Sequence, residues 1–163
     1  MLRKFLVLAC FLVATHLSAA SLSMGRDGEP FTEEGIKWQP VHYSSDERYV
    51  KANLPGEPRS VMSSDGIYMY SNYDNAIYEL QIQNMFPEKP EEGKKQLEKT
   101  SGLKVTKIVK APQPGCLYAI EYQLKTDNSS LKGRLFATKK GAYLALSNGE
   151  VAEAFFESVK FSQ

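Results

Sequence analysis

The chain has 163 residues, of which 42% are hydrophobic and 24% charged, and 20 Lys and Arg against 19 Asp and Glu leave a formal net charge of +1. Because the positive and negative charges nearly balance, the chain lacks the broad positive field of a nucleic-acid-binding protein or of a protein held on anionic lipid. We therefore predict no nucleic-acid partner.

The first 20 residues have the composition of a secretory signal peptide. Arg3 and Lys4 precede an apolar run from Phe5 to Ala14, and small residues follow up to Ala20, after which we place the cleavage site. The apolar run is much shorter than the roughly 20 residues that span a bilayer, so we expect no transmembrane segment after cleavage. Lipidation at Cys10 is the alternative, which the short stretch before that cysteine disfavours.

The remaining 143 residues fit one domain. Residues 21–36 are rich in Gly, Ser and acidic side chains, which predicts a flexible lead-in, and residues 37–163 form the predicted domain. Once Cys10 is removed with the signal peptide, Cys116 is the one cysteine left, so no intramolecular disulfide forms. For an exported protein this favours a bacterial periplasm or extracellular space over a eukaryotic secretory route.

The first half of the predicted domain reads as strands. Tyr49 to Leu54 alternates weakly and is ended by the Pro55-Gly56-Glu57-Pro58 turn. Residues 66–83 read as a hairpin that turns at Asn72 to Asn75, with Tyr78, Leu80 and Ile82 on one face of its second arm.

The second half adds two helices and four strands. Acidic residues followed by lysines and a glycine predict a surface helix from about Glu91 to Thr100. The predicted strands are residues 103–109, 116–124, 131–138 and 142–146. In the second of these, Cys116 falls in register with the apolar Tyr118 and Ile120. The segment from Glu150 to Phe161 has helical spacing at Val151, Ala154, Phe155 and Ser158.

Few residues are available for catalysis. After signal cleavage His42 is the one histidine left, which excludes a multi-histidine metal site, and phosphate-binding, dinucleotide-binding, Cys-x-x-Cys and calcium-loop motifs are missing from the sequence. We predict no cofactor, no metal and no enzymatic activity. The alternative is a thiol-dependent enzyme that uses Cys116 as nucleophile and His42 as its base.

Tyrosines are dense in the hairpin, with Tyr68, Tyr70, Tyr73 and Tyr78 inside twelve residues. Tyrosine suits a sheet surface and a binding face alike, because it offers a large apolar area with a polar tip. Two interpretations stay open, ordinary packing between strands and recognition of a partner. Under the second, Tyr68, Tyr70 and Tyr73 are the candidate partner-binding residues.

Several short elements between Trp38 and Phe161 resemble a known pattern. They are Trp38, Leu54 to Pro58, the strand with Tyr78, Leu80 and Ile82, Gly115, Arg134 to Phe136, Tyr143-Leu144, and Phe155 to Phe161. In this pattern the chain is similar to small exported proteins of the PsbP-like α/β/α sandwich superfamily. The resemblance implies an α+β fold, with a mostly antiparallel central sheet and helices packed on its faces, and a role in binding or assembly.

These observations predict an exported, soluble, non-catalytic binding or assembly module whose partner is a protein. Two alternatives remain open. One is the thiol-dependent enzyme with Cys116 and His42, and the other is a secreted factor that contacts a host or a cell surface through the Tyr68 to Tyr78 hairpin.

Overall fold

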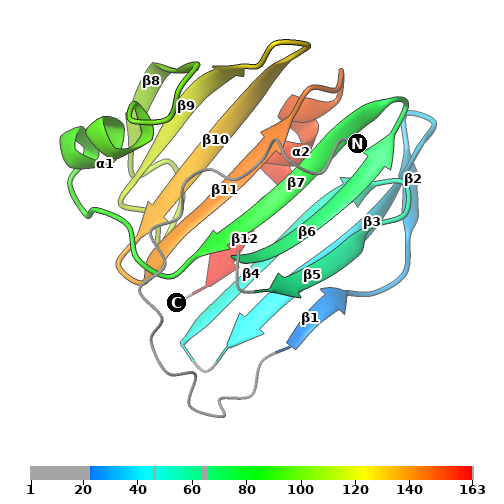
Figure 1. The fold of residues 1–163 in the computed structure, drawn as a ribbon. Coiled ribbons are helices and arrows are strands. Elements are labelled where there is room, and N and C mark those ends of the chain that lie inside the picture. The colour runs from blue at the N-terminus through cyan, green and yellow to red at the C-terminus, as the bar shows by residue number, and fades with distance from the viewer. Residues whose placement is uncertain (1–22, 46, 64–65, 163) are drawn as a thin grey trace.

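A computed structural model describes residues 23–45, 47–63 and 66–162. In these residues, two antiparallel sheets pack face to face, and two short helices lie at their borders (Figure 1). The predicted signal peptide lies outside the described residues.

The smaller sheet, sheet A, is built mainly from the N-terminal part of the chain. Its strand order is β1-β3-β4-β12, and β2 pairs with β3 beside β1. The strands are β1 (Ser23–Arg26), β2 (Phe31–Glu33), β3 (Ile36–Ser45), β4 (Arg48–Pro55) and β12 (Lys160–Ser162). β1 and β2 come from the segment whose composition predicts a flexible lead-in.

The larger sheet, sheet B, has the order β5-β6-β7-β11-β10-β9-β8. Its strands are β5 (Arg59–Ser63), β6 (Gly66–Tyr73), β7 (Ala76–Gln83), β8 (Leu103–Lys110), β9 (Tyr118–Lys125), β10 (Ser130–Thr138) and β11 (Gly141–Ser147). All of its pairs are antiparallel, and β11 lies at the centre. The predicted strands 103–109, 131–138 and 142–146 are confirmed to within a residue or two.

Turn chemistry fixes the hairpins. Between β6 and β7, Asp74 and Asn75 both have positive φ (50° and 59°), which is the backbone of a tight hairpin turn and a conformation that Asp and Asn tolerate. After β4, Gly56 has φ 75° and its N–H donates to the Lys37 carbonyl at 2.8 Å. The Pro55-Gly56 turn therefore ends β4, as the sequence predicts, and in the structure it leads the chain across to sheet B.

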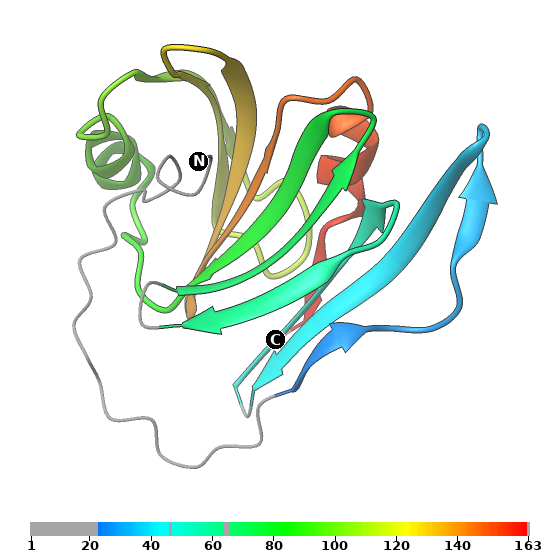
Figure 2. The same ribbon diagram turned by 45° about the vertical axis from the view of Figure 1, so that its right-hand side comes forward.

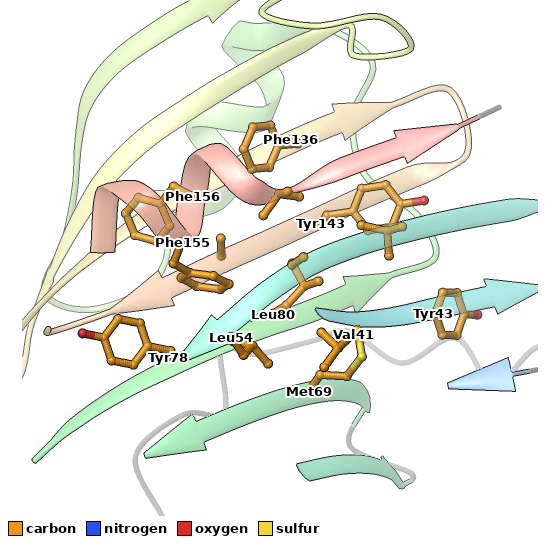
Figure 3. Packing of buried hydrophobic residues seen from close by; sticks show 14 of the residues in the cluster. Val41, Tyr43, Leu54, Met69, Tyr78, Leu80, Phe136, Tyr143, Phe155 and Phe156 are labelled. Carbon is orange, nitrogen blue, oxygen red and sulfur yellow. The ribbon is translucent and has the colours of Figure 1, made fainter. Parts of the chain in front are cut away.

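The first core lies between the sheets (Figure 3). Sheet A contributes Val41, Val50 and Leu54, and sheet B contributes Met69 and Leu80, all 0–1% exposed. Burial of side chains of this size is worth about 1.5–3 kcal/mol each, so this layer is a major source of stability.

A second core lies on the opposite face of sheet B. Its members include Ile120, Tyr122, Leu135 and Leu144, and α1 (Pro90–Leu97) adds Leu97 to it. Figure 2 shows α1 and sheet A on opposite sides of sheet B. The central strands of sheet B thus bury both of their faces.

The predicted α/β/α sandwich is wrong. The face of sheet B that would carry a helical layer is instead covered by sheet A, and the described part of the chain has two helices of seven and eight residues. α2 (Ala152–Ser158) inserts Phe155 and Phe156 between the sheets, and α1 buries little besides Leu97. The physical reason is that neither helix has an apolar stripe wide enough to cover a seven-stranded sheet.

Candidate functional site

Two of the predicted tyrosines stand together on sheet B. Tyr68 and Tyr70 alternate with Met69, which is buried in the first core, so both rings project from the face that is turned away from sheet A. Both are half-buried, and their ring centroids are 6.2 Å apart. Across the β6–β7 ladder Tyr68 faces Gln81 and Tyr70 faces Glu79. We call these four residues the tyrosine surface.

Glu79 is the buried charge-bearing group of this surface. It is 9% exposed, and the Gln81 Nε2 donates to its Oε1 at 2.6 Å. Burial raises the pKa of Glu79, and the hydrogen bond from Gln81 opposes part of that shift. The bond also orients the Gln81 amide toward Glu79.

The tyrosine surface continues into the second core. Glu79 faces Leu146 on β11, Leu146 faces Gly133 on β10, and Gly133 faces Tyr122 on β9. A Cβ on Gly133 would come within 2.1 Å of the Tyr122 ring, so the glycine leaves the space in which that ring lies. Burial raises the pKa of Tyr122, and the negative charge of Glu79 adds to the effect. Glu79 and Tyr122 therefore lie in one line of cross-strand neighbours, and the charge of Glu79 affects the pKa of Tyr122.

Tyr73 does not belong to the tyrosine surface. Side chains of β6 alternate between the two faces of the sheet, so Tyr73 points to the same face as Met69, and its ring packs against the first core. The ring also lies beside Gly56, whose added Cβ would be 3.5 Å from the Tyr73 Cδ2. The structure thus brings Tyr68 and Tyr70 together and places Tyr73 on the opposite face, a separation that the parity of the three positions could have shown.

Cys116 is a buried thiol. It is 6% exposed, and its Sγ donates to the Tyr118 carbonyl at 3.1 Å and to the Ala137 carbonyl at 3.4 Å. Burial raises the pKa of this thiol to about 11. Cys116 precedes β9 and belongs to the first core, so the predicted register with Tyr118 and Ile120, which lie in the second core, is wrong.

His42 lies on sheet A and has other neighbours. Its Nε2 is 2.9 Å from the Ser23 Oγ on the adjacent strand, and its ring stacks on Tyr49 with centroids 6.3 Å apart. The two hydrogen bonds of the Cys116 thiol go to carbonyls of sheet B. The structure therefore does not bring His42 and Cys116 together as a base and its nucleophile.

A cleft of about 520 Å³ opens where the two sheets separate. Its walls come from β8, β9 and β10 of sheet B and from the end of α2 and the start of β12. The lining residues are Val109, Pro112, Gln113, Ala119, Glu121, Arg134, Phe136, Phe156, Glu157, Val159 and Lys160. A volume of this size is in the range of small-ligand sites.

Arg134 organises the charges of this cleft. Its Nη2 donates to Glu121 Oε1 at 3.2 Å and to Glu153 Oε2 at 3.0 Å, and its guanidinium carbon lies 5.5 Å from the centre of the Phe156 ring. Arg134 is not among the site residues predicted from the sequence, where it appears only in the segment Arg134 to Phe136 of the PsbP-like pattern. The signal that could have identified it is a charged residue two positions before Phe136, and therefore on the same face of β10 as that apolar side chain. In the β9–β10 register Arg134 lies opposite Glu121.

Within residues 23–45, 47–63 and 66–162, no group of three or more His, Cys, Asp or Glu side chains is placed to hold a metal ion. Over the same ranges, none of the helices has the length and apolar character needed to cross a bilayer.

Comparison of the chain with protein-family models, with curated proteins and with solved structures found no match. The resemblance to PsbP-like proteins has no support from these comparisons.

Proposed function

We propose that this protein is an exported, non-catalytic binding module that recognises a protein partner through the tyrosine surface. The observation that supports the proposal is the pairing of Tyr68 and Tyr70, two half-buried rings held beside the fixed Glu79–Gln81 pair. Tyrosine provides a large contact area with a hydrogen-bonding tip and loses little conformational entropy on binding. Tyrosine is among the residue types enriched in protein-binding hot spots, and here two tyrosines lie beside a hydrogen-bonded polar pair.

Export rests on the composition of residues 1–20 and is part of the same proposal. Expression in a bacterium followed by mass measurement of the periplasmic and secreted protein tests it. We expect a chain that begins at Ser21. An uncleaved chain that stays in the cytoplasm would contradict export.

The binding proposal is tested with Tyr68→Ser and Tyr70→Ser combined in one variant. Because both rings stand on the outer face of β6, we expect a modest loss of stability, about 1 kcal/mol for each substitution, and loss of partner recovery from native envelope and culture fractions. The fraction that yields the partner distinguishes an envelope partner from the host or surface partner of the alternative proposal.

Tyr73→Ser is the matched control. It removes a tyrosine from the same strand, but from the side that packs against the first core. We expect it to lower the melting temperature more than either outer substitution and to leave partner recovery unchanged below that temperature. A loss of partner recovery in the Tyr73→Ser variant equal to that in the combined variant would point to a packing role for the hairpin and against a tyrosine binding surface.

A further inference from the structure

The tyrosine surface is one end of two longer rows of side chains on the face of sheet B that is turned away from sheet A. Each row crosses the sheet from β6 to β9 through directly opposed residues. The rows are Tyr68, Gln81, Leu144, Leu135 and Ile120, and Tyr70, Glu79, Leu146, Gly133 and Tyr122. We call their five large side chains on β9, β10 and β11 the apolar band: Ile120, Tyr122, Leu135, Leu144 and Leu146.

The described elements cover the apolar band at one end. α1 packs on β8 and β9, and its Leu97 belongs to the second core (Figure 1). Outside sheet B, β11 packs against α2 and β10 meets Phe161 of β12, but both of these contacts lie on the first-core side. Leu135, Leu144 and Leu146 are nevertheless only 0–3% exposed. Their burial therefore calls for an apolar cover beyond α1.

The chain outside the described residues contains one segment with suitable chemistry. Residues 1–22 precede β1, and the other positions that the structure does not describe are 46, 64, 65 and 163. Within residues 1–22, the run from Phe5 to Ala14 has ten residues and no charge. Such a segment covers a leucine face favourably, because it buries apolar area without burying an unpaired polar side chain.

The length of this run also matches the face. From β6 to β9 the strand order β6-β7-β11-β10-β9 contains four inter-strand spacings, which together span about 19 Å. A helix of ten residues is about 15 Å long. A single short helix can therefore lie across the leucines, between α1 and the tyrosine surface.

We propose that the apolar band binds an uncharged apolar peptide segment, which is residues 5–14 in the uncleaved chain. Removal of the signal peptide then frees the band for a segment of the same chemistry in the partner. The inference rests on the proposed function for the cleavage and for the existence of a partner. It adds the chemistry that the partner presents beside Tyr68 and Tyr70, and it makes the uncleaved chain unable to bind.

The first test compares the full chain with the chain shortened to begin at Ser21, both made by cell-free synthesis without a signal peptidase. The probe is a fluorescent peptide of residues 5–14 with Cys10→Ser and two lysines added at each end. We expect the shortened chain to bind it at least about tenfold more tightly, because in the full chain the tethered segment competes at high effective concentration.

The control peptide carries Leu8→Glu and Phe11→Glu in the same probe. It should bind the shortened chain at least about tenfold more weakly, because the band would bury two carboxylates without partners. Within the protein, Leu144→Glu should weaken binding of the original probe by a similar factor. Gln123→Glu, which adds the same charge at an exposed position on the other face of β9, should change it less than twofold.

Backbone amide shifts locate the site without any substitution in the protein. On titration of the original probe into the ¹⁵N-labelled shortened chain, we expect shifts of Leu135, Leu144 and Leu146. Val50 and Ala52, which lie in sheet A, should not shift.

Four results would overturn the inference. The first is equal affinity of the probe for the full and shortened chains, and the second is amide shifts confined to positions outside the apolar band. The third is displacement of the probe by palmitate at lower concentration than by unlabelled peptide, which would identify a lipid chain as the occupant. The fourth is a concentration-dependent shift of the band amides without peptide, which would identify a second copy of the protein.

This test and the test of the proposed function can fail separately. Cell-free synthesis makes the peptide measurement independent of export, so an uncleaved chain in the bacterial cytoplasm would count against the proposed function alone. A shortened chain that recovers its partner through Tyr68 and Tyr70 but does not bind the probe would overturn this inference alone.

Discussion

At the scale of single residues, Cys116 shows how burial removes reactivity from a thiol. The nucleophile in thiol chemistry is the thiolate, and burial holds the pKa of this group at about 11. The two carbonyls that accept from Sγ do not replace an activating base. Cys116 packs as a small side chain in the first core, and this packing explains why a cysteine fits at this position without any catalytic role.

We expect Cys116 to resist a soluble thiol reagent in the native protein at pH 7.5 and to react fully in guanidinium chloride. The measurement is the labelling rate of the full chain with Cys10→Ser, which leaves Cys116 as the one cysteine. Since an unfolded thiol ionises near 9.0 and the folded one near 11, the free energy of unfolding should also fall as the pH rises between these values. Rapid native labelling at pH 7.5 would revive the enzyme alternative.

Glu79 gives a second prediction at this scale, through the pH dependence of stability. Burial raises its folded pKa above the unfolded value of 4.5, so its protonated form is favoured in the folded protein. The stability that this preference contributes is complete below pH 4.5 and is lost as the pH rises through the folded pKa. Glu79→Gln removes the titration, so the variant should gain in melting temperature over the wild type as the pH rises from 4.5.

The control for Glu79→Gln is Glu88→Gln, at an exposed position before α1. It should leave the pH dependence of the melting temperature unchanged. Parallel curves for wild type and Glu79→Gln across pH 4 to 8 would mean that the pKa of Glu79 is the same in the folded and unfolded states, which would contradict the shift that burial causes.

At the scale of elements, much of sheet B could be predicted from the sequence, whereas β4 is the strand of sheet A that the sequence predicts. The strong alternation of Tyr78, Leu80 and Ile82, and the Asp74-Asn75 turn, predict β7 and its hairpin, because one face of each strand is buried and the turn has φ above zero. β1 and β2 lack this pattern, since their residues are mostly exposed and their pairing with β3 is set by tertiary contacts.

Of the two candidate sites, the tyrosine surface could be predicted from the sequence and the cleft could not. Tyrosine density identified Tyr68 and Tyr70, while the cleft at Arg134 depends on how far sheet A extends over sheet B, which no local pattern encodes. The predicted helix from Glu150 to Phe161 ends at Ser158 because β12 follows, and Phe161 is held by rings of sheet B.

Ser158 ties the end of α2 to sheet A and gives a prediction at this scale. Its Oγ accepts from the Asn53 N–H at 2.9 Å and donates to the Phe155 carbonyl at 2.7 Å. Ser158→Ala leaves the partly buried Asn53 N–H without that acceptor, which costs about 1–3 kcal/mol. Denaturant unfolding measures the loss, and Ser158→Thr, which keeps the hydroxyl, should recover part of it. A neutral Ser158→Ala variant would show that water replaces the hydroxyl.

At the scale of the whole molecule, sheet B lies between the two cores and contributes one face to each of them. β11 is buried along all seven of its residues, because sheet A and α2 cover one face and the second core covers the other. Sheet A contributes one face to a core, and its β1 and β2 strands are mostly exposed. The resistance of a segment to opening should follow this order of burial.

Hydrogen exchange measures this order directly. We expect the slowest backbone amides in β11 and in the paired strands β7 and β10, slower than those of β4, and the fastest among the strands in β1 and β2. The physical reason is that exchange from β11 requires both cores to open, whereas β1 can separate from β3 while the inter-sheet core stays intact. If β3 and β4 instead exchange as slowly as β11 at every denaturant concentration, the two sheets open as one cooperative unit.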